Sequence, residues 1–415
     1  MSENLTAAVS RELLERAAKL DAADELAPLR ARFTLPEGVY LDGNSLGALP
    51  AHVPARVADV VGRQWGELLI RSWSESAWWT APERIGDRIA PLVGAAPGQI
   101  VVGDSTSVNV FKAVVGAVRL HDDPARTDVL VDAATFPTDG YLAASAARLT
   151  GRRLIPVRAA ELPAALGPST AAVLINHVDF RTGRLHDMAA LTAAAHEAGA
   201  VAVWDLCHSA GALPVALDDC GVDFAVGCTY KYLNGGPGAP AFLHVAQRHQ
   251  GFFDSPLPGW TSHGDPFAMT EEYTAAEGVT RGRVGTPDIL SMLALEAALE
   301  VWDGVRPDSV RAKSLALTDL FLDCVAEYVP GGLDGPDSRV RSMTPYAHGE
   351  RGSQIALRCA EAPAVMAGLI ARGVVGDLRR PDVLRFGFTP LYTRFADAER
   401  AAAVLAEVLG EVPAA

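Results

Sequence analysis

The sequence has little of what marks nucleic-acid-binding, membrane or secreted proteins. Its 36 basic residues against 50 acidic ones give a net charge of -14 without long runs of one sign, which argues against a nucleic-acid partner. No apolar run reaches the ~18 residues of a membrane span, and the first residues lack the basic and apolar regions of a signal peptide. We therefore expect a globular cytoplasmic protein with neither a nucleic-acid nor a membrane partner.

Cysteine is also scarce. The five cysteines are odd in number and form no CxxC pair. Because most of them lie in apolar stretches, we interpret them as small core residues. We expect neither disulfides nor a metal site. The five cysteines are Cys207, Cys220, Cys228, Cys324 and Cys359.

Lysine is rare, and one lysine is oddly placed. Arginine supplies most of the positive charge, and Lys231 is the only lysine between Lys112 and Lys313. It follows the apolar run "DFAVGCTY", where a charge on a long flexible side chain is poorly placed unless it has a use.

Apolar residues are abundant. They make up 49% of the 415 residues, enough for a large core and for two lobes, because single cores stop growing at roughly 250 to 300 residues. From about Ile100, short β-branched runs such as "QIVVGD" and "DVLVDAAT" alternate with amphipathic stretches such as "SVNVFKAVVGAV". This pattern predicts an α/β fold with a mostly parallel sheet that helices cover on both faces.

The chain divides into three parts by pattern. We expect residues 1–60 to form an N-terminal segment that packs on the small domain, residues 61–305 to form the large domain, and residues 306–415 to form a smaller C-terminal α+β domain. A cluster of Gly and Pro in "VPGGLDGPDS" interrupts the last part.

Polar residues close several of the predicted strands. In open α/β sheets, ligands bind beyond the carboxyl ends of the strands. The polar segments at these ends are 104–107, 135–139, 205–208 and 229–231. We expect them to lie together at one edge of the sheet.

A use for Lys231 is a Schiff base with pyridoxal 5'-phosphate (PLP), a cofactor that also needs a carboxylate at its pyridinium nitrogen. Asp205 ends a buried run 26 positions before Lys231. A carboxylate there would keep the ring nitrogen protonated through an opposite charge at close range. His208, three residues further on, could face the same ring.

The phosphate and the ring of such a cofactor need partners of their own. Thr106 and Ser107 open a predicted helix after a strand, where hydroxyls and unpaired helix N–H groups suit a dianion. Phe136 ends another strand and could cover the ring, and Asp139 could reach the hydroxyl side of the cofactor.

Each of these residues has an ordinary interpretation when taken alone. A strand-end lysine is often a solvated side chain, Asp205 or "STS" is often a helix cap, and His208 is often a core residue. Four such features at successive strand ends of one sheet favour a PLP enzyme with the aspartate-aminotransferase-like fold.

Longer motifs resemble one family. "YLDGNSLGALP", "FPTDGY", "NHVDFRTGRLHDM", "WDLCHSAGALPV" and "GCTYKYLNGGPGAP" together resemble kynureninase over essentially the whole chain. The resemblance implies PLP fold type I with a sheet of the seven-stranded type, and a homodimer with its active site at the interface. It also implies hydrolysis of the Cβ–Cγ bond of L-kynurenine to anthranilate and L-alanine, a step of the kynurenine pathway in tryptophan catabolism and NAD biosynthesis.

The resemblance also implies roles for the strand-end residues. Lys231 would be the Schiff-base lysine and the base at Cα, and Tyr230 would bind the phosphate and relay protons. Asp205 would pair with the pyridinium nitrogen, with His208 beside it. The others would bind the cofactor: Phe136 by stacking, Asp139 by support, and Thr106 and Ser107 at the phosphate.

Residues elsewhere in the chain complete the implied site. Trp260 and Thr286 resemble phosphate contacts at the subunit interface. Arg385, in "VLRFGFTPLY", would bind the α-carboxylate of the substrate, because a planar guanidinium can hold both oxygens. Three further residues fall in the substrate-binding motifs, and these are Ser45, Trp73 and His263.

One position departs from the family pattern. Thr261 follows Trp260 where bacterial relatives commonly have an aromatic residue. Its hydroxyl could accommodate a ring-substituted substrate such as 3-hydroxykynurenine, or the change could be neutral. Trp73 falls near the position that lines the aryl pocket and favours an unsubstituted ring. We keep L-kynurenine as the predicted substrate.

Other functions stay open at this point. Another PLP enzyme of this fold, an aminotransferase or a desulfurase-like lyase, is the nearest alternative. A desulfurase needs a mobile nucleophilic cysteine, whereas Cys324 falls in a predicted helix and Cys359 ends a strand. A regulatory PLP-binding protein would need an added DNA-binding module. A GxSxG hydrolase is not supported, because "CHSAG" lacks the first glycine.

Overall fold

The computed structural model describes residues 2–414 and divides the chain into two compact units. The large unit comprises His52–Phe180 and His186–Glu300. The small unit comprises the residues up to Ala51, the short segment Arg181–Leu185, and the chain from Val301 onward. The sequence pattern placed the two boundaries at residues 60 and 305, and it gave no sign of the short segment.

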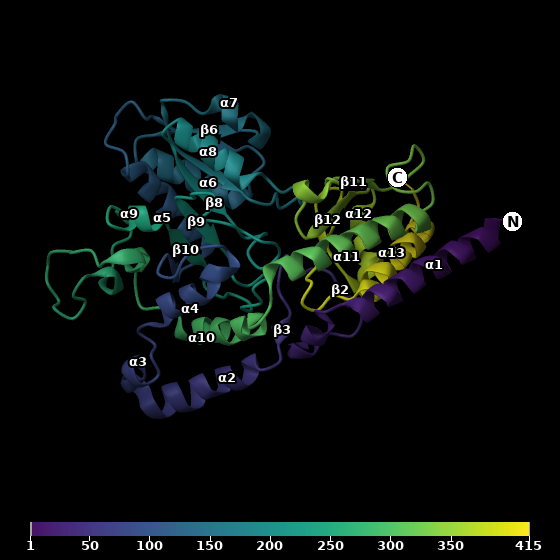
Figure 1. The fold of residues 1–415 in the computed structure, drawn as a ribbon, viewed down its shortest axis with the longest axis horizontal. Coiled ribbons are helices and arrows are strands. Elements are labelled where there is room, and N and C mark those ends of the chain that lie inside the picture. Colours follow the sequence, from purple (N-terminus) through teal and green to yellow (C-terminus); the bar gives the residue numbers. More distant parts are fainter. Residues whose placement is uncertain (1, 415) are drawn as a thin grey trace. The chain divides into compact units, whose positions relative to one another are not determined.

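A seven-stranded sheet forms the centre of the large unit (Figure 1). Its α/β character, with a mostly parallel sheet, is confirmed. Neighbouring strands are parallel from β9 to β6, whereas β10 runs antiparallel to both of its neighbours. In spatial order the strands are β4 (Ile100–Val102), β10 (Phe242–Val245), β9 (Phe224–Gly227), β8 (Val201–Asp205), β7 (Thr170–Asn176), β5 (Asp128–Asp132) and β6 (Arg153–Val157).

Helices flank this sheet (Figure 1). Helix α5 has an apolar face at helical spacing, with Val110, Val114 and Val118 all buried against sheet residues such as Val129 and Val203. Burial of this face fixes the helix on the sheet. The helices of the unit are α2 (Val53–Asp59), α3 (Ser72–Glu75), α4 (Ala81–Ile89), α5 (Thr106–Arg119), α6 (Pro137–Leu149), α7 (Leu162–Ala165), α8 (Met188–Glu197), α9 (Gln247–Gln250) and α10 (Ile289–Ala298).

Polar side chains mark the carboxyl ends of the central strands. Strand β8 is buried along its whole length, and Asp205 is its only charged residue. Asn176 ends the neighbouring strand β7, and the parallel register pairs Asn176 with Asp205. The register therefore places an amide beside a carboxylate at one edge of the sheet.

The small unit contains a four-stranded antiparallel sheet, in the order β11 (Arg341–Ser342), β12 (Gln354–Arg358), β15 (Val383–Gly387) and β14 (Asp377–Arg379). Two short pairs join other parts of the unit: β1 (Phe33–Thr34) with β3 (Leu49–Pro50), and β2 (Val39–Tyr40) with β13 (Val374–Val375). Its helices are α1 (Ser2–Ala23), α11 (Pro307–Tyr328), α12 (Ala362–Ala371) and α13 (Phe395–Glu411).

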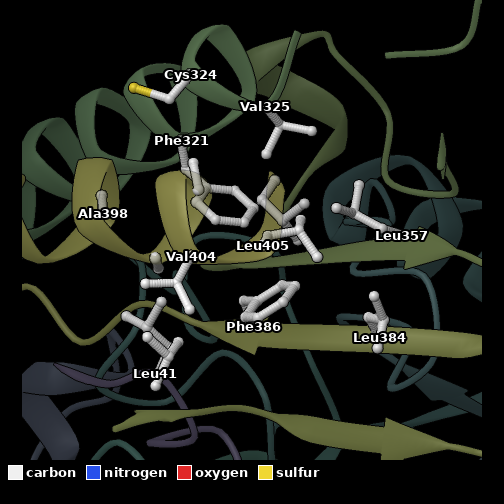
Figure 2. Packing of buried hydrophobic residues seen from close by; sticks show 14 of the residues in the cluster. Leu41, Phe321, Cys324, Val325, Leu357, Leu384, Phe386, Ala398, Val404 and Leu405 are labelled. Carbon is white, nitrogen blue, oxygen red and sulfur yellow. The ribbon is translucent and has the colours of Figure 1, made fainter. Parts of the chain in front are cut away.

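The core of the small unit lies between helices and sheet. Figure 2 shows Phe321 of α11 and Leu405 of α13 facing Phe386 of β15. The rings of Phe321 and Phe386 lie 5.1 Å apart at an angle of 51°. Helix α1 packs on α13 and α11 and adds Leu13 and Ala17 to this core, so the start of the chain belongs to this unit. Among the described helices, none combines the length and apolarity that a membrane crossing requires.

Strand β10 carries an unusual core residue. His244 is fully buried, and neither of its ring nitrogens has a hydrogen-bond partner. Burial lowers the pKa of His244 from 6.5 to about 4. The neutral imidazole is therefore the form that the fold requires.

This burial predicts a loss of stability in mild acid. Below pH 6.5 the unfolded chain protonates His244 while the folded chain does not, so the folded state loses about 1.4 kcal/mol per pH unit down to pH 4, or about 2 kcal/mol at pH 5. His244→Leu removes this titration. We expect the melting temperature of the variant to fall less than that of the wild type between pH 7 and pH 5. Equal decreases would contradict the assignment.

Candidate active site

One pocket of the large unit brings together eight of the residues that the sequence pointed to. They are Thr106, Ser107, Phe136, Asp139, Asp205, His208, Tyr230 and Lys231, and the lining also includes Thr138, Asn176, Phe180 and Cys207. These residues follow the carboxyl ends of strands β4, β5, β7, β8 and β9. The expected meeting of the strand ends at one edge of the sheet is therefore found.

Lys231 follows strand β9 in a tight turn. The amide of Asn234 donates to the carbonyl of Lys231, and the amide of Gly235 donates to that of Thr229. Gly235 has little room for a side chain, because a Cβ there would lie 2.8 Å from Cδ1 of Leu295, 3.0 Å from Cβ of Ala239 and 3.1 Å from the carbonyl oxygen of Thr229. The turn points Lys231 toward His208, with Nζ 3.0 Å from Nε2 of the imidazole.

Two buried carboxylates share one amide in this pocket. Nδ2 of Asn176 lies 3.0 Å from Oδ2 of Asp139 and 2.6 Å from Oδ2 of Asp205. The other oxygen of Asp205 accepts a hydrogen bond from the amide of Cys207 at 2.7 Å. Burial, and then the charge of Asp205, raise the pKa of Asp139 well above its usual value. The pocket thus offers an acceptor-rich, negative wall that suits a cationic or N–H-donating group.

Asn176 is a site residue that the sequence analysis did not name. It closes the buried run "AAVLIN" just as Asp205 closes "VAVWD". The rule that selected Asp205 would have selected Asn176 too. Only the register of β7 against β8, however, shows that its amide reaches two carboxylates.

The aromatic wall of the pocket has two rings. Phe136 precedes helix α6, which starts with Pro137 at its first position. The Phe136 side chain is 39% exposed, so its face is available to a ligand. Phe180 stands against it edge-on, with centroids 5.2 Å apart at 88°. Phe180 was also missed, although it follows the end of β7 as Phe136 follows the end of β5.

The N-terminus of α5 forms another wall. Ser105 caps this 14-residue helix, and its hydroxyl accepts from the amide of Val108. Thr106 and Ser107 are the first two helical residues. Their N–H groups have no acceptor within the helix, and the helix dipole favours an anion there.

Two thiols lie behind the pocket. The Cys228 amide donates to Sγ of Cys207 at 3.2 Å. Hydrogen bonding to Cys228 and burial raise the pKa of the Cys207 thiol, so it stays neutral. Four of the five cysteines are buried, as interpreted from the sequence, whereas Cys220 is partly exposed; all five are free thiols.

Tyr230 is a protonated phenol. Burial, and then the electrostatic effect of the Cys228 thiol, raise its pKa above the usual value of 10. It can therefore donate a hydrogen bond and return a proton without holding a negative charge at neutral pH.

Four other predicted residues of the large unit lie outside this pocket. Trp260 and His263 line a second hollow, and Thr286 lines a third. Trp73 packs its ring edge-on against Trp79 at 6.1 Å, and Trp79 in turn lies 5.4 Å from Trp260. The structure thus joins Trp73 and Trp260 in one aromatic cluster, although the sequence gave them separate roles.

Arg385 and Ser45 belong to the small unit. The side chain of Arg385 is fully buried, with 0% exposure. Its Nη2 lies 2.6 Å from Oδ2 of Asp377 and donates to the hydroxyl of Ser45 at 2.9 Å. Asp42 lies in the same cluster, where burial raises its pKa to about 6. The sequence analysis named neither carboxylate.

Family models match most of the chain. The model described as "Aminotransferase class-V" matches residues 40–355, and the model described as "Kynureninase C-terminal domain" matches residues 310–405. The curated kynureninase of Deinococcus radiodurans is 50% identical over 405 residues and that of Burkholderia pseudomallei is 47% identical over 402 residues, each match covering 95% of both chains.

Solved structures share the fold at low identity. The cysteine desulfurase CsdA of Escherichia coli superposes with a TM-score of 0.78 at 20% identity, covering 94% of this chain and 99% of its own. A mutant of C-DES with glycine covalently linked to its PLP cofactor superposes with a TM-score of 0.77 at 19% identity, covering 91% of this chain and 99% of its own. These likenesses establish the architecture of the chain.

The paired carboxylates predict a pH effect on the cofactor-free protein. The raised pKa of Asp139 means that the folded state keeps a proton that the unfolded state loses, so stability falls as the pH rises above about 4. Asp139→Asn keeps an acceptor for Asn176 and does not titrate. Without cofactor, its melting temperature should exceed that of the wild type at pH 8, and the difference should shrink toward pH 5. A difference in melting temperature that does not change with pH would contradict this explanation.

Proposed function

The chain belongs to the kynureninase family, and from this membership we propose that it is a PLP-dependent hydrolase that cleaves the Cβ–Cγ bond of L-kynurenine to anthranilate and L-alanine. The observation that carries the proposal is the pocket in which an amine, two carboxylates, an aromatic face and a helix N-terminus meet. We place the reaction in the kynurenine pathway of tryptophan catabolism and NAD biosynthesis.

The residues of the pocket fit PLP. Lys231 supplies the amine for a covalent link, and Asp205 supplies a buried carboxylate for a protonated ring nitrogen. Phe136 offers an exposed aromatic face, and Thr106 and Ser107 offer hydroxyls and helix N–H groups for a phosphate. When bound, PLP supplies an electron sink for charge that develops beside the substrate amine.

Proton transfers fall to the residues around Lys231. Lys231 would take the proton from Cα of the substrate. His208 lies 3.0 Å from its Nζ and orients the amine. Tyr230 stays protonated because its pKa is raised, so it relays a proton as water adds to the γ-carbonyl. Cleavage then releases anthranilate and a fragment that becomes L-alanine after protonation.

Arg385 is our candidate for the α-carboxylate of the substrate. Its guanidinium is held by Asp377 and Ser45, which fix the orientation of the planar fork. A substrate carboxylate would compete with Asp377 for the same cation. Substrate affinity therefore depends on this internal pair.

We propose unsubstituted L-kynurenine as the preferred substrate. The hydroxyl of Thr261 is buried and donates to the backbone carbonyls of Val284 and Gly285, at 3.2 and 3.1 Å. It is thus engaged within the loop and is not offered to a ring hydroxyl. The departure from the family pattern then affects loop packing rather than pocket polarity.

We further propose a cytoplasmic homodimer. Trp260 and Thr286 line hollows other than the pocket of Lys231, which fits phosphate contacts made to the cofactor of a partner subunit. Five free thiols fit a reducing compartment.

The two cysteines considered for the desulfurase-like alternative are poor nucleophiles. Burial raises the pKa of Cys324 to about 12 and that of Cys359 to about 11, so neither provides a reactive thiolate. Aminotransfer is the remaining alternative of this fold. Anthranilate fluorescence from kynurenine without a keto acid supports hydrolysis, whereas kynurenic acid formed only with a keto acid would support aminotransfer.

Lys231→Ala tests the centre of the proposal. The variant should lose the visible absorption of the lysine-linked cofactor, and its kcat should fall by about a thousandfold or more, because both the covalent link and the base at Cα are removed. Lys19→Ala, on the exposed side of helix α1, serves as the control and should retain both. Colourless wild-type protein in the presence of PLP would contradict the proposal.

Thr261→Val tests the substrate preference. Because the hydroxyl bonds to the backbone, its loss should lower the melting temperature and leave the ratio of kcat/KM for kynurenine to that for 3-hydroxykynurenine within about twofold of the wild-type ratio. The wild-type ratio should favour kynurenine. A ratio that shifts strongly toward kynurenine in the variant would show that the hydroxyl contacts the ring.

A further inference from the structure

Lys112 is a buried cation with two acceptors on different segments. It lies on α5 and is 1% exposed. Its Nζ lies 2.7 Å from Oδ2 of Asp104 and donates to the carbonyl of Gly282 at 2.7 Å. Removing an ammonium from water is costly unless it is paired and hydrogen-bonded. These two contacts are therefore what makes the buried position of Lys112 tenable.

The first acceptor belongs to the turn that starts α5. Asp104 has a φ of +56°, in the left-handed region that non-glycine residues seldom adopt. It directly precedes the helix cap Ser105, and Thr106 and Ser107 come next. The ion pair with Lys112 thus holds the turn that aims the helix N-terminus into the cofactor pocket.

The second acceptor starts the segment that leads to Thr286. Gly282 ends the 3₁₀ helix η7 (Gly278–Gly282). It packs closely on the sheet, because a Cβ there would lie 3.0 Å from Leu243 and 3.1 Å from Val101. A hollow of about 160 Å³ is lined by both segments, and its lining includes Asp104, Lys112, Gly282 and Thr286. Lys112 is hydrogen-bonded to both segments, through Asp104 and Gly282.

We infer that Lys112 is a positioning residue for the cofactor phosphate, which holds segments 104–107 and 282–286 at a fixed spacing without contacting the phosphate itself. The inference rests on the proposed PLP function, in which Thr106, Ser107 and Thr286 bind phosphate. In the proposed homodimer the two segments of one chain serve two different cofactor sites. Each site then depends on the Lys112 of both chains.

The chain offers a matched control for this inference. Lys313 is also a buried lysine, 7% exposed, with Nζ 2.7 Å from Oδ2 of Asp24. Lys313 and Asp24 belong to the small unit. Lys313→Met therefore removes a comparable buried ion pair without touching either phosphate segment.

The experiment compares two forms of the cofactor on cofactor-free protein. Dissociation constants are measured for PLP and for pyridoxal, which lacks the phosphate. Lys112→Met should raise the constant for PLP about tenfold, the loss typical of one charge-assisted hydrogen bond, and change that for pyridoxal less than about twofold. Lys313→Met should lower the melting temperature and leave the ratio of the two constants at the wild-type value.

The outcomes separate this inference from the function on which it rests. Wild-type protein that binds no PLP would refute the proposed function. Wild-type protein that binds PLP, with an unchanged PLP-to-pyridoxal ratio in Lys112→Met, would overturn the role of Lys112. An equal rise of the ratio in Lys313→Met would also overturn it, because general destabilisation would then be the cause.

A second variant covers a failure of Lys112→Met to fold. Asp104→Asn keeps a residue that tolerates the left-handed backbone and removes only the ion pair. It should lower the preference for PLP over pyridoxal several-fold, with most of the change again in the constant for PLP. An unchanged preference in folded Asp104→Asn would overturn the inference.

Discussion

Two carboxylates, Asp139 and Asp205, are held against one amide at the carboxyl edge of a parallel sheet. The parallel register of β7 and β8 imposes this arrangement by placing Asn176 beside Asp205. Burial then makes the negative charge costly unless a proton or a nearby cation neutralises it. The chemistry of the pocket follows, because a ring nitrogen that must stay protonated is stabilised by a carboxylate fixed beside it.

Lysine is scarce in this chain, and three of its lysines lie in specific polar surroundings. Lys231 stands beside an imidazole in the pocket, whereas Lys112 and Lys313 are buried and paired to carboxylates. Arginine, which stays charged and hydrates weakly, serves at most other positions. Lys112 is buried where a compact ammonium reaches two acceptors, and Lys231 stands where an amine can react.

Sequence reasoning reached the cofactor pocket because the pocket obeys a local rule. Each of Thr106, Phe136, Asp205 and Lys231 follows a short apolar run, and parallel strands bring such ends together whatever loops join them. The same rule covers Phe180, which follows the end of β7, although we did not apply it there. It does not cover Asp377, whose role depends on its pairing with Arg385. Motif resemblance named Arg385 but could not show that it is fully buried.

The order of apolar runs and polar ends along the chain determined the α/β architecture, the cluster at the sheet edge and the family, since these depend on periodicity and on residue types at fixed spacing. Tertiary structure alone decided which of these side chains share partners. The amide between two carboxylates, the hydroxyl of Thr261 bound to backbone carbonyls and the span of Lys112 from Asp104 to Gly282 join residues far apart in the chain. Such contacts are set by strand register and by packing, which no local pattern encodes.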